Sequence, residues 1–158
     1  MVLDESDIEP LPLDYIDIKT TIKVYLKNCW QDNWEVINTP DPMFLYKIKP
    51  IISEWKSSNR ANRAEEIKIT RLRLDTCLFN RKHHFANELH PNCNSCPTPI
   101  SVKHIILDCP QFSNQRKPII DYLRTSNIPI TLPSILNDDF PHALLFKFLK
   151  DIKYLEQI

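Results

Sequence analysis

The stretch that decides the fold reads Cys93-Asn-Ser-Cys96-Pro-Thr-Pro-Ile-Ser-Val-Lys-His104-Ile-Ile-Leu-Asp-Cys109-Pro110. Within it, three cysteines and one histidine follow the pattern C-x2-C-x7-H-x4-C. Thiolate sulfur and imidazole nitrogen are the ligands that tetrahedral zinc takes in structural sites. The sequence therefore predicts a Zn²⁺ ion held by Cys93, Cys96, His104 and Cys109. Because the protein supplies all four ligands, no position remains for water, and the predicted site is structural, not catalytic.

The two halves of this motif need different local structures. The spacing of Cys93 and Cys96 suits a tight turn that directs both sulfurs to one point. The residues before Pro110 predict a short helix, because the residue that precedes a proline is pushed out of the helical region. In an α-helix, residues five apart differ by about 140°, so Cys109 is expected to bend back from a frayed helix end to join His104. Three upstream histidines fit a ligand set less well: His83, His84 and His90.

The five cysteines admit two other interpretations. The motif residues can be ordinary reduced thiols beside a surface histidine. A disulfide framework is disfavoured, because the cysteine count is odd and the first residues are acidic where a secretory signal would be basic. Cys29 and Cys77 each lie in an apolar run and are expected to be small buried residues. No apolar stretch is long enough to cross a bilayer, so we expect an intracellular protein of the cytoplasm or the nucleus, without a membrane partner.

Glycine is absent from the 158 residues, and thirteen prolines mark the breaks between elements. Motifs that need glycine, such as the P-loop and the dinucleotide-binding fingerprint, are thereby excluded. Primed hairpin turns also need glycine, which disfavours a β-rich fold. The predicted fold is mainly α: a small helical domain with a CCHC zinc-stapled knuckle.

The breaks divide the chain into four predicted parts. They are a disordered or extended N-terminus at 1–13, a helical arm with a basic segment at 14–82, the CCHC knuckle and its following helix at 83–126, and a connector with a C-terminal helix at 127–158. Hydrophobic periodicity predicts helices at about 15–37, 62–77, 110–125 and 141 to near the end, with an extended apolar piece before Pro50.

Two of these helices carry an apolar face at helical spacing. In the first, the face consists of Ile22, Leu26, Cys29, Trp30 and Trp34. In the last, it consists of Leu144, Phe148, Ile152 and Leu155. We expect both faces to lie in the core. The two tryptophans are therefore expected to be core residues and not a platform on which nucleic-acid bases stack.

The net charge is zero, but the charges are unevenly distributed. Residues 56–82 hold eight basic and three acidic side chains, whereas residues 1–55 hold five basic and ten acidic ones. The local excess of cations predicts a surface that faces phosphates, although a solvated helix face is an equally good interpretation. The near-neutral isoelectric point disfavours strong non-specific binding of nucleic acid by the whole chain.

One further string reads Glu66-Ile-Lys-Ile-Thr-Arg-Leu-Arg73, and the Cys-x2-Cys pair and Ser101-Val-Lys-His-Ile-Ile-Leu-Asp-Cys-Pro110 follow it. This combination resembles the C-terminal region, downstream of RNase H, of jockey-type non-LTR (LINE) retrotransposon reverse transcriptases. The resemblance runs from about residue 13 to the end, and all four zinc ligands match. The chain departs from the family after Arg73, where an aliphatic residue, glycine, histidine and threonine are usual and Leu74-Asp75-Thr76-Cys77 stands here.

The resemblance implies a zinc-stabilised module that holds RNA or DNA without reading base sequence. Phosphate contacts are expected from Arg60, Arg63, Lys68, Arg71, Arg73, Arg81, Lys82 and Lys103. Because Arg71 and Arg73 differ by about 200° on a helix, one of the two is expected to pair with a nearby acid instead: Glu65, Glu66 or Asp75.

Catalysis is not expected from this chain. The paired aspartates of a polymerase palm and the four metal-binding carboxylates of RNase H do not fit within it, although the parent family is an RNA-directed DNA polymerase. No small-molecule substrate is expected either. The alternative function is a structural or protein-interaction helical domain, or a decayed retroelement fragment without a selected function.

Overall fold

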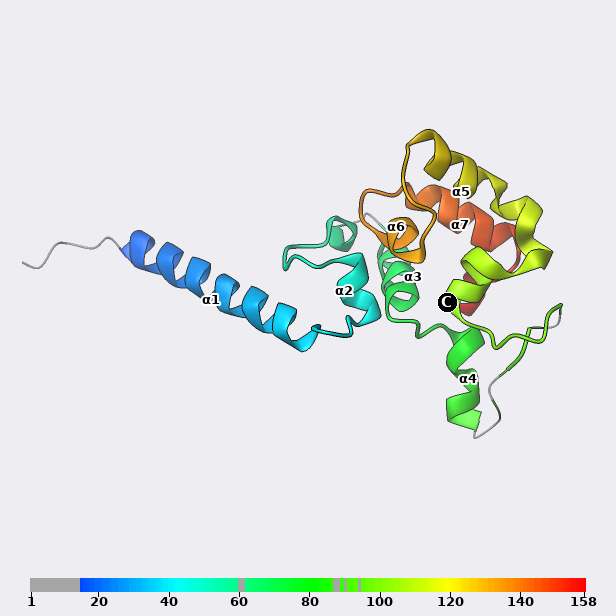
Figure 1. Ribbon diagram of the computed structural model, residues 1–158, viewed down its shortest axis with the longest axis horizontal. Helices are drawn as coiled ribbons and strands as arrows, with labels where there is room; N and C mark the ends of the chain where they lie inside the picture. Colours follow the sequence, from blue (N-terminus) through cyan, green and yellow to red (C-terminus); the bar gives the residue numbers. More distant parts are fainter. Residues whose placement is uncertain (1–14, 60–61, 87–88, 90, 94) are drawn as a thin grey trace, which may run out of the picture.

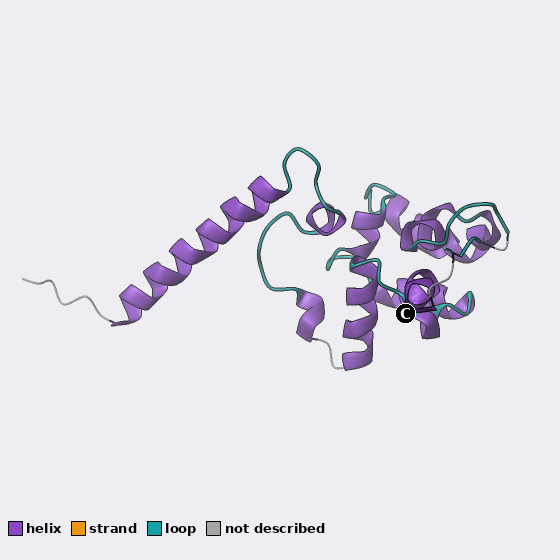
Figure 2. Cartoon of the chain, turned by 90° about the horizontal axis from the view of Figure 1, so that it is seen from below, coloured by secondary structure: helices purple, strands orange, loops and turns teal. Residues whose placement is uncertain are grey.

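The computed structural model describes residues 15–59, 62–86, 89, 91–93 and 95–158. The predicted N-terminal part at 1–13, Arg60 and His90 lie outside these residues. Within them, every regular element is a helix (Figures 1 and 2), and β pairing is limited to one antiparallel bridge between Asn92 and Pro99. The prediction of a small, mainly α domain is confirmed.

Helix α1 (Tyr15–Ile37) has the predicted bounds, but it projects from the body as a single arm (Figure 1). None of its residues is buried, and Trp30 is 69% exposed. The expectation that Ile22, Leu26, Cys29, Trp30 and Trp34 lie in the core is therefore wrong. Helical periodicity identifies a face that can be covered, but it does not determine whether the covering residues belong to the same chain.

The C-terminal part of α1 is attached to the loop at 49–52 through polar side chains. Gln31 donates from Nε2 to the carbonyl of Pro50 over 3.0 Å and accepts the Ile52 N–H at Oε1 over 2.8 Å. Trp34 donates from Nε1 to the carbonyl of Lys49 over 3.3 Å. The ring of Trp34 also lies 5.7 Å from that of Tyr46, centroid to centroid. These contacts fix the end of α1, while its first turns project away from the body (Figure 1).

Helix α2 (Phe44–Ile48) lies where an extended piece was predicted, so that prediction is wrong. Pro50 restricts only the residue before it. Lys49 is accordingly extended, with φ −141°, and residues 44–48 remain free to form one helical turn. The turn packs on α6 (Leu132–Leu136), a short helix in the predicted connector whose N-cap Thr131 accepts the Ser134 N–H.

The core lies among α3 (Arg63–Arg73), α5 (Ser113–Thr125), α6 and α7 (His142–Asp151). Helix α5 packs along α7, and α3 packs on α2 and α6 (Figure 1). In α7, Leu145 and Leu149 join Phe148 in the core, and Leu144 is half-buried. The helix ends at Asp151, so the buried Ile152 and the half-buried Leu155, which the predicted helix included, lie beyond it. Because α3 belongs to this core, the arm consists of α1 alone. The predicted helix at 62–77 ends at Arg73, and α4 (Leu78–Ala86) begins after a turn.

Three helices end in a left-handed residue that is not glycine. These are Asp75 after α3, Asn127 after α5 and Lys153 after α7, with φ of 52°, 54° and 63°. In each case the next N–H reaches back to a carbonyl five residues earlier, from Thr76 to Arg71, Ile128 to Leu123 and Tyr154 to Leu149. This is the hydrogen bond of the Schellman motif, in which glycine is the usual left-handed residue. The glycine-free chain thus keeps the motif and accepts the steric cost at the three positions.

Asp75 makes contacts that a glycine could not make. Its Oδ1 accepts the Val102 N–H over 3.1 Å and the Asn80 Nδ2–H over 2.6 Å. Its main-chain carbonyl also accepts from Asn80 and from Arg81, and a glycine would keep these two bonds. The side chain therefore links the end of α3 to α4 and to the segment that carries the second pair of predicted ligands.

We predict opposite effects of glycine at two of these positions. Lys153→Gly is expected to raise the free energy of unfolding by about 1 kcal/mol, because glycine has no Cβ to clash at positive φ. Asp75→Gly is expected to lower it, because the bonds to Val102 and Asn80 are lost. Urea denaturation measures both changes. Equal stabilisation by the two substitutions would contradict a structural role for the Asp75 side chain.

Candidate metal centre

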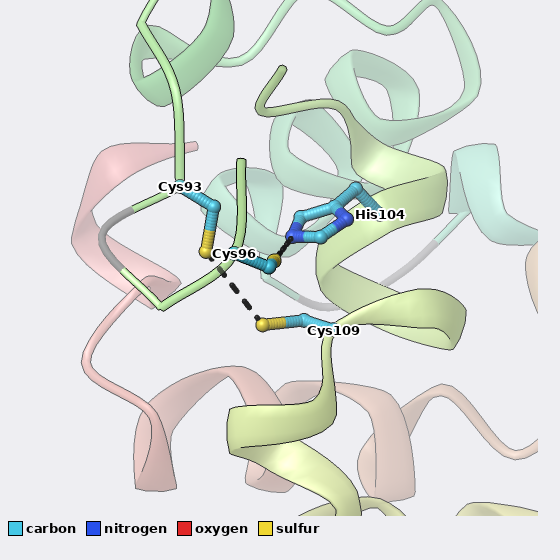
Figure 3. Close-up of side chains that lie close together, drawn as sticks. All are labelled: Cys93, Cys96, His104 and Cys109. Carbon is cyan, nitrogen blue, oxygen red and sulfur yellow. Dashed lines mark hydrogen bonds between the residues drawn. The ribbon is translucent and has the colours of Figure 1, made fainter. Parts of the chain in front are cut away.

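The four predicted ligands meet at one point (Figure 3). Their donor atoms, three Sγ and one imidazole nitrogen, all lie within 4.8 Å of one another. The sulfurs of Cys93 and Cys109 are 3.8 Å apart, and Cys96 Sγ is 3.3 Å from His104 Nε2. Such a group of converging thiol and imidazole donors can bind a metal ion.

A small hairpin carries the first pair of ligands. The Cys93 N–H donates to the carbonyl of Thr98 over 2.9 Å, and the Ile100 N–H donates to that of Pro91 over 3.0 Å. Within the turn, the Thr98 N–H donates to the carbonyl of Cys96 over 2.7 Å. These main-chain bonds hold the turn closed, so both sulfurs point to the same side of it (Figure 3).

A π-helical turn, η3 (His104–Asp108), carries the second pair of ligands. The Cys109 N–H donates to the carbonyl of His104, five residues earlier, over 2.7 Å. In a π turn, residues i and i+5 have the relation that i and i+4 have in an α-helix, so both side chains lie on one face. The expected frayed helix end is therefore wrong: the turn is hydrogen-bonded, and its wider winding aligns His104 with Cys109.

The centre lies at the edge of the core. His104 and Cys109 are buried, whereas Cys93 and Cys96 are half-buried. Nδ1 of His104 is buried without a hydrogen-bond partner in the described part of the chain. A neutral imidazole is the form that binds metal, and burying it costs less than burying an imidazolium.

The thiols of the centre differ in acidity. Burial alone would raise the pKa of Cys93, but the Ser95 N–H and the side chains of His104, Cys96 and Cys109 lower it to about 6. Burial and the two neighbouring cysteines raise the pKa of Cys96. The surroundings thus favour the thiolate form of Cys93 and disfavour that of Cys96. By contrast, burial raises the pKa of the isolated Cys77 thiol to about 12. Cys77 is fully buried, as predicted, and Cys29 is half-buried.

Arg116 contacts the centre from α5, and the sequence reasoning missed it. Its side chain is 7% exposed. Nε donates to the carbonyl of Ile106 over 2.6 Å, and Nη2 donates to those of Ile105 and Cys109 over 3.3 and 2.9 Å. Burial lowers the pKa of Arg116, and the nearby Cys109 and Asp108 oppose that shift. The signal in the sequence is a cation at helical spacing from two core residues, Ile119 and Leu123.

Arg73 is one of the predicted phosphate contacts, but it lies inside the core. Its guanidinium is buried and donates to Asp138 Oδ1 over 2.9 Å, to Ser57 Oγ over 2.7 Å and to the carbonyl of Leu136 over 2.8 Å. The Trp55 ring covers it at 3.8 Å. Burial would raise the pKa of Asp138, but hydrogen bonds from Arg73 and Ser57 lower it. The buried Arg73 side chain connects elements of the core and is not accessible to a phosphate. Its acidic partner is Asp138, 65 residues further along the chain, and not one of the three neighbouring acids that the sequence suggested.

The other predicted cations lie in three different settings. Lys68 donates to the carbonyl of Leu155, and Arg71 donates to that of Ile158 over 2.9 Å, so both tie α3 to the end of the chain. Arg71 is exposed despite this bond, and four further cations are exposed on α3, α4 and the segment before the π turn: Arg63, Arg81, Lys82 and Lys103. Arg60 lies outside the described residues. The structure thus leaves a smaller set of exposed cations than the sequence predicts.

The upstream histidines do not belong to the cluster in the described part of the chain. His83 is buried and does not belong to the four donors. The side chain of His84 lies outside the described part. None of the described helices combines the length and the apolar character that crossing a bilayer requires.

We predict that Cys96→Ser abolishes metal binding and unfolds the segment at 91–109, because the remaining three ligands do not close the site. Hydrogen exchange and metal content per chain measure the two effects. Cys29→Ser is the matched control: it removes one thiol from α1, outside the cluster, and is expected to leave both readouts unchanged. Retained metal and an unchanged thermal transition in Cys96→Ser would contradict this role of the four ligands.

Comparison with known proteins identifies no relative: no protein family model, no curated protein and no solved structure matches the chain. The resemblance to retrotransposon reverse transcriptases therefore remains a prediction that rests on sequence motifs alone. What the centre does is inferred from its geometry.

Proposed function

We propose that the chain is a zinc-stapled, non-catalytic helical module that binds nucleic acid through exposed cations. The observation that carries this proposal is the convergence of four soft donors within 4.8 Å. With Zn–S bonds of about 2.3 Å, the edge between two sulfurs of a tetrahedral zinc site is about 3.8 Å. The distance between the Cys93 and Cys109 sulfurs is 3.8 Å.

A structural role follows from the ligand count. Four protein ligands close a tetrahedral site, so zinc there has no open position for water or substrate. Zinc binding to such ligand sets contributes on the order of 10 kcal/mol in small peptides, which is comparable with the whole stability of a small domain. The hairpin and the π turn are each short, so zinc is the element that joins them.

The nucleic-acid part of the proposal rests on Arg63, Arg81, Lys82 and Lys103. Arg63 pairs with Glu66 over 2.5 Å, and Lys103 pairs with Asp108 over 3.9 Å. The Lys103–Asp108 pair is exposed on both sides, and such pairs contribute about 0–1 kcal/mol, so a phosphate can replace Asp108 at little cost. Glu66 is buried, so Arg63 is expected to keep this carboxylate and to contact a phosphate with the exposed part of its guanidinium. Contacts to phosphate hold the backbone and do not read bases. The proposed ligand is therefore RNA or DNA without sequence specificity.

A protein partner is the second candidate, and α1 favours it. Tyr15, Ile22, Leu26 and Trp30 are each more than half exposed on this one helix. Apolar side chains gathered in this way mark interaction sites more often than solvated surfaces. Zinc would then hold a scaffold whose partner is another polypeptide.

Elemental analysis tests the metal. We predict one zinc per chain in the purified protein, which a chelator removes together with the near-ultraviolet signal of packed aromatic rings. Zinc added back is expected to restore that signal. A protein that is folded and free of zinc under reducing conditions would contradict the proposal.

The salt dependence of binding tests the nucleic-acid surface. Four phosphate contacts predict a slope of log affinity against log salt of about −3 to −4, whereas eight contacts predict about −7. The measurement uses fluorescence anisotropy with labelled single-stranded RNA and duplex DNA. Replacing Arg63, Arg81, Lys82 and Lys103 by Gln is expected to flatten the slope. The same charge change at Lys117, Arg124, Lys147 and Lys150 is the control. Absence of binding at about 0.1 M salt would favour the protein partner.

A further inference from the structure

Arg116 is a buried cation without a carboxylate bound to it in the described structure. Its guanidinium donates to three main-chain carbonyls, those of Ile105, Ile106 and Cys109. A buried charge is costly unless an opposite charge or well-placed dipoles compensate it. The carbonyls supply dipoles. Asp108 also attracts the guanidinium, but its carboxylate is exposed and is not hydrogen-bonded to Arg116 in the described structure. A closer and more buried negative charge would compensate Arg116 better.

The proposed zinc centre supplies that charge. Three thiolates and one neutral imidazole around Zn²⁺ carry a net charge of −1, as the formal charges of the ligands require. One of the thiolates belongs to Cys109, whose own carbonyl accepts the Arg116 N–H over 2.9 Å. The guanidinium and the centre are thus neighbours with opposite charge at the edge of the core, where water screens them less than at the surface.

The three carbonyls that Arg116 binds belong to the π turn and to the residue that ends it. Ile105 and Ile106 directly follow the ligand His104, and Cys109 is the ligand that ends the turn. Carbonyls in the last turn of a helix have no partner within it and need donors from outside. Arg116 supplies these donors from α5, so the side chain fixes the stretch between both ligands.

We propose that Arg116 is a positioning residue of the metal centre: its guanidinium neutralises the thiolate-bound zinc and fixes the turn that presents His104 and Cys109. This inference rests on the proposed zinc site. It predicts that Arg116 acts on metal affinity, and not only on the stability of the fold. A second buried arginine, Arg73, allows the two effects to be separated, because its contacts are with Asp138, Ser57 and Leu136.

The test measures zinc affinity in the full chain by competition with a chromogenic chelator. Arg116→Met is expected to weaken affinity by about 10–100-fold, the range found when partners of metal ligands are removed. Arg73→Met is the matched control, expected to lower the unfolding temperature and leave zinc affinity within about twofold. Arg116→Lys keeps the charge but lacks the guanidinium fork, so an intermediate affinity is expected. The visible bands of the Co²⁺-substituted protein are expected to shift in both Arg116 variants and not in Arg73→Met.

The outcomes separate this inference from the zinc site itself. A wild-type chain that binds no zinc overturns both. A wild-type chain that binds zinc, together with Arg116→Met at wild-type affinity and an unchanged Co²⁺ spectrum, overturns the inference alone. If Arg116→Met does not fold, Arg116→Lys decides: wild-type affinity with an unchanged spectrum overturns the role of the guanidinium. Equal loss of affinity in Arg73→Met also overturns it, because the effect would then follow from stability alone.

Discussion

The hydrogen bond from the Cys109 N–H to the carbonyl of His104 is the constraint on which the centre depends. It widens one helical turn so that residues five apart share a face. An ordinary α-turn in the same place would direct His104 and Cys109 to different sides. Asp75 contacts the start of this segment at Val102, and Arg116 contacts its end. The C-terminal end of α3 and the first turn of α5 therefore hold the π turn between them, and folding of the core positions His104 and Cys109.

The cluster of Cys93, Cys96, His104 and Cys109 was predictable, because a possible metal site is recognised from residue types and their spacing. The π turn was not predictable, because the chain between His104 and Cys109 also suits an α-helix. The choice between the two depends on packing and on donors from other elements, such as Arg116. Helix α2 was missed for a related reason: Pro50 restricts one residue, and packing on α6 decides the rest. The bounds of α1 followed from its periodicity, but the location of its partner did not. The local sequence pattern thus determines that a segment is helical. Contacts with residues distant in sequence determine whether it winds as an α-helix or a π turn, and which elements it packs against.

The positions of the cations show that a segment rich in basic residues does not necessarily form a basic surface. Arg73 and Arg116 both lie in the core, and each binds main-chain carbonyls of another element. Lys68 and Arg71 bind the end of the chain. Because an arginine carries five donors in a fixed fork, it can satisfy carbonyls that would otherwise lack a partner, such as that of Leu136 and those of Ile105, Ile106 and Cys109. Part of the positive charge between residues 56 and 82 thus serves folding, and part is exposed on the surface.

The two proposed kinds of partner use different parts of the molecule. The exposed cations lie on α3, α4 and the segment before the π turn, whereas the exposed apolar side chains lie on α1. Most helices in proteins depend on packing of one face, whereas α1 buries none of its residues and is tied to the body by hydrogen bonds from Gln31 and Trp34 near its C-terminal end. A polypeptide on the first half of α1 would cover its apolar face without touching Arg63, Lys82 or Lys103. Binding of nucleic acid to the body therefore does not exclude binding of a protein to the arm, and the salt dependence reports on the body alone.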